Sequence, residues 1–186
     1  NVLVNDDITT LNDGTATFTV STLLDVAADA DMSLDGAFLQ NGGGSVQTAG
    51  DVITSNDDIT FTNDVTLTDS HSVVMSTGGG AGNITFINTL DATTDFDEDL
   101  TLTAGGGNID FQEAVGVTND LDDVDIVSAA NVTTDANGFR SDMLLQQVGT
   151  GTTTFNGPVV INDTGAGAGT SIDITSANVA VNSTIA

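Results

Sequence analysis

The stretch that decides the fold is "NITFINTLDATTDFDEDLTLTAGGGNIDF" (Asn83 to Phe111), in which a short pattern begins, runs out and starts again. Its triplets Ile84-Thr85-Phe86 and Ile109-Asp110-Phe111 lie 25 residues apart, and Ile59-Thr60-Phe61 lies 25 residues earlier still. Four positions after each Phe stands an apolar residue: Val65, Leu90 and Val115. A constant spacing of this kind is typical of repeat architectures.

The pattern extends in both directions with less regularity. Downstream, "NVTT" (Asn131 to Thr134) and "TTTF" (Thr152 to Phe155) take the place of the triplet. Upstream, "NDDITTLND" (Asn5 to Asp13) nearly repeats "NDDITFTND" (Asn56 to Asp64) 51 residues earlier, which we interpret as two periods, with "MSL" (Met32 to Leu34) midway. We therefore expect about seven coils with a period near 25 residues.

Within each unit the apolar residues alternate with polar ones, and β-branched residues are in excess, which is typical of strands. If each unit is one coil, equivalent residues stack about 4.8 Å apart, and Phe61, Phe86 and Phe111 form an inward ladder. The alternative, a β-sandwich, has no reason to keep a constant period. We predict an all-β, parallel β-solenoid that forms a single domain over residues 1–186, as a segment of a longer chain or fibre.

The charge balance excludes several classes of binding partner. The chain has 27 acidic residues, Arg140 as its single Arg or Lys, and a formal net charge of -26 with His neutral. Such a surface repels nucleic acid and anionic membranes, and no apolar run is long enough to span a bilayer. Cysteine is absent, so disulfides are excluded. We expect surroundings rich in salt or calcium, with no nucleic-acid partner and no membrane insertion, and the absence of cysteine is compatible with an extracellular or cell-surface location.

Four strings carry a resemblance to a known family: "GNITF" (Gly82 to Phe86), "DLTLTAGGGNIDF" (Asp99 to Phe111), "VGTGTTTFNGPV" (Val148 to Val159) and "GAGTSIDITSANVAVNSTI" (Gly167 to Ile185). In order and spacing they resemble the repeats of giant filamentous-haemagglutinin-like bacterial surface adhesins. The resemblance implies a right-handed parallel β-solenoid displayed outside the cell, with a role in adhesion, biofilm or surface fibres. This chain departs from the family in its higher acidity.

Two acidic segments occupy equivalent places in successive units. They are "DFDED" (Asp95 to Asp99) and "DLDDVD" (Asp120 to Asp125). Counting from Phe86 and Phe111, Asp95 matches Asp120, Asp97 matches Asp122, and Glu98 matches Asp123. Stacked carboxylates repel each other unless a cation bridges them, and hard oxygen ligands suit calcium. The candidate calcium ligands are therefore Asp95, Asp97, Glu98, Asp120, Asp122 and Asp123. Alternatively, this is a solvated corner whose carboxylates splay apart; no other cofactor is indicated.

The expected function is structural: a repeat module that stacks end to end, on copies of itself or on adjoining repeats, into a surface fibre. We expect no enzyme, because His71 has no identifiable catalytic partner and Arg140 is expected to pair with Asp135 or Asp142 or to dock against another chain. The alternatives are a polysaccharide-active β-helix enzyme, a calcium-binding solenoid, or an ice-binding solenoid with flat rows of Thr such as Thr66 to Thr68 and Thr101 to Thr103. A host, surface or matrix polysaccharide is a candidate partner.

Overall fold

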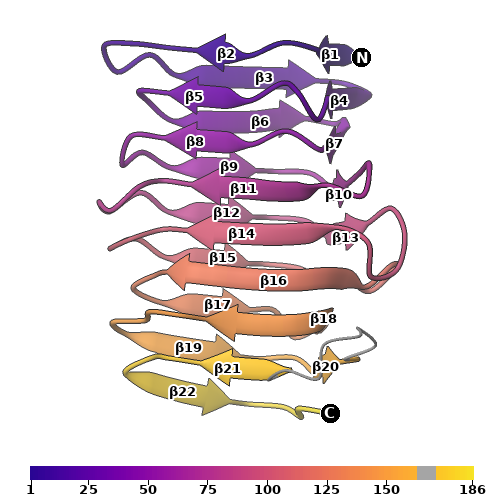
Figure 1. Ribbon diagram of the computed structural model, residues 1–186, viewed down its shortest axis with the longest axis vertical. Coiled ribbons are helices and arrows are strands. Elements are labelled where there is room, and N and C mark those ends of the chain that lie inside the picture. The colour runs from indigo at the N-terminus through magenta and orange to yellow at the C-terminus, as the bar shows by residue number, and fades with distance from the viewer. Residues whose placement is uncertain (163–170) are drawn as a thin grey trace.

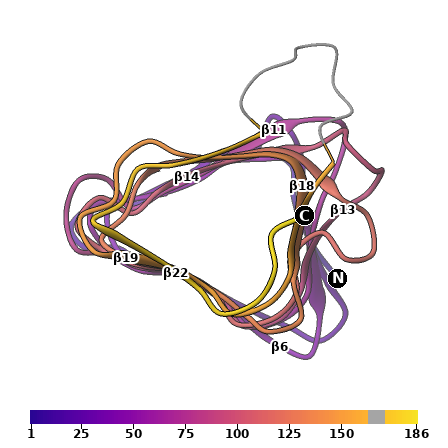
Figure 2. The same cartoon turned by 90° about the horizontal axis from the view of Figure 1, so that it is seen from below.

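The chain winds into a column of stacked coils with a roughly triangular cross-section (Figures 1 and 2). The computed structural model describes residues 1–162 and 171–186, so residues 167–170 of the fourth family-like string lie outside it. No helix occurs in the described ranges, and every named strand pair is parallel. The predicted all-β parallel β-solenoid is therefore confirmed.

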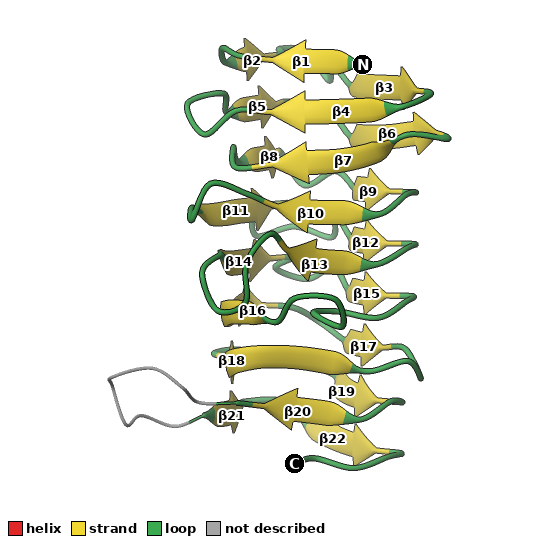
Figure 3. Cartoon of the chain, turned by 90° about the vertical axis from the view of Figure 1, so that its right-hand side faces the viewer, coloured by secondary structure: helices red, strands yellow, loops and turns green. Residues whose placement is uncertain are grey.

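The coils contribute strands to three sheets that run along the column (Figure 3), and the first of these sheets ends at the fifth coil. The first sheet contains β1 (Val2–Val4), β4 (Leu23–Val26), β7 (Ser45–Thr48), β10 (Val65–Leu67) and β13 (Leu90–Ala92). The second contains β2 (Ile8–Thr9), β5 (Met32–Leu34), β8 (Val52–Thr54), β11 (Ser72–Ser76), β14 (Asp99–Thr103), β16 (Leu121–Ser128), β18 (Phe139–Gln146) and β20 (Val159–Ile161), with β21 (Ile172–Ile174) also on β18. The third contains β3 (Ala16–Val20), β6 (Phe38–Gly42), β9 (Ile59–Phe61), β12 (Ile84–Phe86), β15 (Ile109–Phe111), β17 (Val132–Thr134), β19 (Thr152–Phe155) and β22 (Asn178–Val181).

The column has about eight turns with a period near 22 residues, not seven turns of 25. Val2 pairs with Leu24, Leu24 with Val46, and Val46 with Val65, so the first spacings are 22, 22 and 19 residues. The next pairs, Val65 with Leu90 and Leu90 with Val115, have the spacing of 25, as do the strands of the ladder of Phe61, Phe86 and Phe111 in the third sheet. The regular middle of the chain had set the predicted period.

The upstream alignment was wrong for the same reason. Ile8 lies in β2 of the second sheet, whereas Ile59 lies in β9 of the third, so the two similar nine-residue strings form different sides of the triangle. The residue that pairs with Ile59 from the preceding coil is Phe38. Met32 pairs with Ile8 in the coil before and with Val52 in the coil after.

The predicted aromatic ladder is present in the core. Phe61, Phe86 and Phe111 are each 1% exposed, and consecutive rings stack with centroids 5.4 Å apart. Phe38 extends the row toward the N-terminus, with its centroid 5.0 Å from that of Phe61. At the other end Thr134 takes the register position after Phe111, and Phe139 packs edge-on against Phe111 instead. Burial of these rings is a main source of the stability of the column.

Candidate functional site

The acidic corner is the edge of the column where the chain passes from the first sheet to the second. We define it by eight carboxylates from three successive coils: Asp95, Asp97, Glu98, Asp99, Asp120, Asp122, Asp123 and Asp142. The first four lie in or after the loop between β13 and β14, the next three at the start of β16, and Asp142 lies within β18. Six of the eight are the residues that the sequence singled out.

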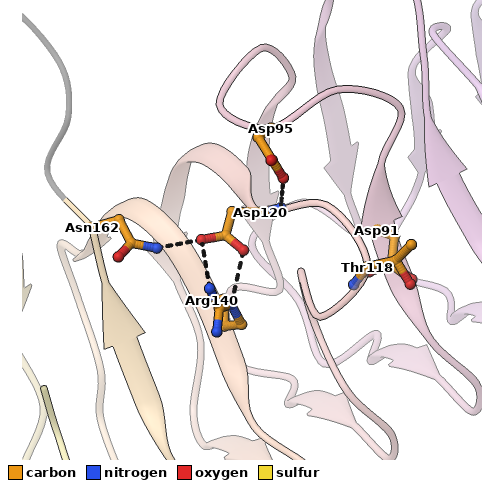
Figure 4. Close-up of polar contacts among 6 residues, drawn as sticks. All are labelled: Asp91, Asp95, Thr118, Asp120, Arg140 and Asn162. Atoms are coloured by element: carbon orange, nitrogen blue, oxygen red, sulfur yellow. Dashed lines mark hydrogen bonds and ion pairs between the residues drawn. The ribbon is translucent and has the colours of Figure 1, made fainter.

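In one part of the corner, Asp95 and Asp120 have hydrogen-bond partners (Figure 4). The Asp120 carboxylate, which is 5% exposed, accepts hydrogen bonds from Arg140, at 2.8 Å from Nε and 3.4 Å from Nη2, and from the Asn162 amide. The backbone N–H of Asp120 donates to Asp95 Oδ1 at 2.9 Å. Arg140 therefore pairs with Asp120 rather than with Asp135 or Asp142, and it neutralises a carboxylate that would be costly to bury alone.

The register of the other part differs from the prediction by one residue. Leu100 pairs with Val124, a spacing of 24, and Asp123 N–H donates to Asp99 Oδ1 at 3.2 Å. Asp99 rather than Glu98 thus stands opposite Asp123. Asp122 lies next to Glu98 of the preceding coil, because the Asp122 N–H donates to the Glu98 carbonyl oxygen at 3.0 Å. The predicted pairs Asp97–Asp122 and Glu98–Asp123 are wrong, and the pair Asp95–Asp120 is correct.

The tightest group of carboxylates in the corner is Asp122, Asp123 and Asp142, whose nearest oxygens all lie within 4.8 Å of one another. Burial raises the pKa of Asp122 to about 6, and negative charge adds to the effect, from Asp123, Asp99, Asp142 and Asp97 in that order. Burial likewise raises the pKa of Asp123, with Asp99 as the largest charge contribution. We call these three residues the carboxylate cluster. Repulsion between neighbouring carboxylates in the corner is concentrated there.

The remaining predicted ligands lie beside the carboxylate cluster and have partners of their own. Asp97 accepts a hydrogen bond from the Ser70 hydroxyl of the preceding coil. Glu98 is 1% exposed and accepts the Thr94 N–H at 3.3 Å, and burial raises its pKa. The sequence missed Asp99 and Asp142. Asp99 belonged to the quoted segment but was not among the candidate ligands. Asp142 was not predicted because Leu121 pairs with Ser141, a spacing of 20 residues instead of the expected 25.

Of the other candidate features, the Thr segments lie away from the acidic corner and His71 lies beside it. The two "TLT" segments lie in β10 and β14, which belong to different sheets, so they do not form a common row of Thr. His71 is exposed in the turn between β10 and β11, at the same edge one coil before the acidic corner. It stands between Ser70, which donates to Asp97, and Ser72, which pairs with Asp99. The acidic corner thus offers carboxylate oxygens suited to a hard cation and one neutralised Arg–Asp pair.

The comparisons with known proteins give no family for the chain. No protein-family model, curated protein or solved structure matches it. The part of the chain that the structure describes has no helix with the length and apolarity needed to cross a bilayer.

Proposed function

We propose that the chain is a structural repeat module that is continued end to end by further coils and forms a fibre or adhesive stalk outside the cell. The single observation that carries the proposal is the contrast between rungs inside the column and rungs at its ends. Phe155 is 1% exposed, whereas Val181, its register partner in the last coil, is 45% exposed. Thr153 is 1% exposed, and its partner Val179 is 50% exposed.

Both ends of the column have this character. In the first coil Val2 and Ile8 are only partly buried, whereas their register partners Leu24 and Met32 in the next coil are 0% exposed. In the last coil Ile185 is 45% exposed. Unpaired strand edges with apolar side chains favour pairing with another chain or with adjoining repeats. One more coil at each end would pair the free backbone groups and bury the apolar rungs, as each interior coil does for its neighbours. Adhesion and display outside the cell rest on the family resemblance and on the negative charge.

Assembly of the purified chain tests the proposal. We expect concentration-dependent linear oligomers in sedimentation and electron microscopy. Val181→Lys places a charge on the exposed edge and should suppress them, whereas Thr66→Lys, on an outer face in mid-column, should not. A chain that stays monomeric at every concentration, or a Val181→Lys variant that assembles as well as Thr66→Lys, would reject stacking through these ends.

We also propose calcium binding at the acidic corner, because the carboxylate cluster gathers three carboxylates from two coils. A divalent cation there would replace repulsion by coordination and tie β16 to β18. Calcium should raise the melting temperature, a chelator should reverse the rise, and Asp122→Asn combined with Asp123→Asn should abolish it. Asp110→Asn, on the third sheet, is the matched control. An equal rise in both variants would mean general screening and no site.

The proposed role is not catalytic. Arg140 is held by Asp120, and His71 is exposed and lies outside the carboxylate cluster. Incubation with soluble polysaccharides should release no reducing sugar above a blank. Release that Asp122→Asn abolishes would instead favour the polysaccharide-active alternative.

A further inference from the structure

We propose that a polar trough along the third sheet binds a neutral, linear polysaccharide. The trough has a volume of about 500 Å³ and crosses four successive coils, which is within the size range of ligand sites. Its lining consists of a corner row, Asp58, Asn83, Asn108 and Asn131, and a face row, Thr85, Asp110 and Thr133, together with Ile109. This inference goes beyond the proposed stacking and does not depend on it.

The corner row is held rigid by a ladder of side-chain hydrogen bonds. Asn83 Nδ2 donates to Asp58 Oδ1 at 3.0 Å, Asn108 Nδ2 to Asn83 Oδ1 at 3.1 Å, and Asn131 Nδ2 to Asn108 Oδ1 at 2.7 Å. An amide nitrogen has two hydrogens, and the ladder uses one from each residue. Each Asn therefore keeps a donor for a ligand in a fixed position, which lowers the entropy lost on binding.

The face row repeats in the same register. Thr85 pairs with Asp110, and Asp110 with Thr133. Hydroxyl and carboxylate groups thus recur beside the amides once per coil, about 4.8 Å apart. A ligand that itself repeats along its length gains contacts at every coil, whereas a small ligand gains them at one or two. The trough therefore favours a chain molecule lying parallel to the column.

The chemistry of the walls selects the class of chain. A net charge of -26, with Asp58 and Asp110 in the trough, repels polyanions. The walls have no aromatic side chain, so a flat apolar ligand has nothing to stack on. A polyamine would satisfy the carboxylates but would leave the amide donors facing a cation. Sugar hydroxyls both donate and accept, so a neutral polysaccharide matches amides, hydroxyls and carboxylates alike.

Blocking variants test the trough directly. Binding of cello-oligosaccharides and malto-oligosaccharides of increasing length is measured by calorimetry, with spermine and polygalacturonate as the cationic and anionic probes. We expect a neutral series to bind, with affinity rising at least about tenfold from dimer to hexamer. Thr85→Arg should lower the affinity of the hexamer at least about tenfold. Thr101→Arg is the matched control on an outward position of the second sheet and should leave it unchanged.

The remaining outcomes overturn the proposal. These are no saturable binding of either neutral series below about 1 mM, binding of spermine or polygalacturonate in place of the neutral chains, or equal effects of Thr85→Arg and Thr101→Arg. Melting curves establish that both variants fold. If Thr85→Arg does not fold, Thr133→Arg takes its place as the variant that blocks the trough. Sedimentation of the same variants keeps the two proposals separate, because Thr85→Arg should assemble like the unmodified chain.

Discussion

At the scale of the residue, the excess of Asp over Glu has a structural cause. Of the 27 acids only Glu98 and Glu113 are Glu. Short Asp side chains repeatedly accept a backbone N–H from the next coil: Asp7 from Asp31, Asp31 from Asp51, and Asp51 from Val74, at 3.1, 3.1 and 2.8 Å. Asn83 does the same for Asn108 at 3.0 Å. Asp and Asn thus satisfy backbone donors near the corners.

Substitutions at Asp31 separate this acceptor role from charge. Asp31→Ala removes the acceptor for the Asp51 N–H and should lower the free energy of unfolding by roughly 0.5–1.5 kcal/mol. Burial raises the pKa of Asp51, and the charge of Asp31 adds to this effect. Asp31→Asn keeps an acceptor oxygen and removes that charge, so it should be at least as stable as the unmodified chain. Urea unfolding measures both. Equal destabilisation by Ala and Asn would disprove the acceptor role.

The carboxylate cluster makes stability depend on pH in an unusual direction. The pKa of Asp122 is about 6 in the folded chain against an ordinary 3.8, so the folded state binds this proton more tightly than the unfolded state. Its contribution to stability is complete below pH 3.8 and is lost as the pH rises through about 6. Asp123, Glu98 and Asp51 also have raised pKa values and act in the same direction.

The melting temperature should therefore rise as the pH is lowered from about 7 to about 4.5. Asp122→Asn should be more stable than the unmodified chain at the upper end and should reduce this pH dependence, because the amide mimics the protonated acid. Asp110→Asn, outside the acidic corner, should keep the full dependence. A melting temperature that falls on acidification over this range would contradict the assignment.

At the scale of the element, the sequence predicted what was periodic and failed where the spacing changed. The ladder of Phe61, Phe86 and Phe111 was predictable because two equal spacings align the same type of side chain. The placement of Ile8 with Ile59 failed because corners of different length shift the register, while similar Asn-Asp-Asp-Ile-Thr strings suit more than one corner. Asp142 was missed because it enters the carboxylate cluster from a strand whose spacing is shorter by several residues.

Glycine marks the corners where coils come closest, and this gives a matched pair of substitutions. A Cβ at Gly107 would lie 1.9 Å from the carbonyl oxygen of Gly82 in the preceding coil, whereas a Cβ at Gly79 meets nothing within 4 Å. Gly107→Ala should therefore lower the free energy of unfolding by roughly 1–3 kcal/mol or more, because backbone must move. Gly79→Ala should have little effect. Similar denaturation midpoints for the two variants would refute this coil contact.

At the scale of the whole molecule, charge opposes the fold that hydrogen bonding and burial support. Carboxylates on neighbouring coils stand about 5 Å apart, and Arg140 is the only Arg or Lys in the sequence. Compaction brings 27 acidic groups closer together than they are in the unfolded chain, so self-repulsion lowers the stability of the folded state. The column therefore needs counterions around it even if none occupies a defined site.

Ionic strength should consequently raise the melting temperature steadily. The screening length falls from about 10 Å at 0.1 M salt to about 3 Å at 1 M, which is below the distance between neighbouring coils. Sodium and potassium chloride should act alike, because screening depends on charge and not on coordination. Sulfate salts are avoided, since they also strengthen apolar burial. If calorimetry shows a melting temperature that is flat in salt, the carboxylates do not repel one another appreciably, and the acidic corner would not require a cation either.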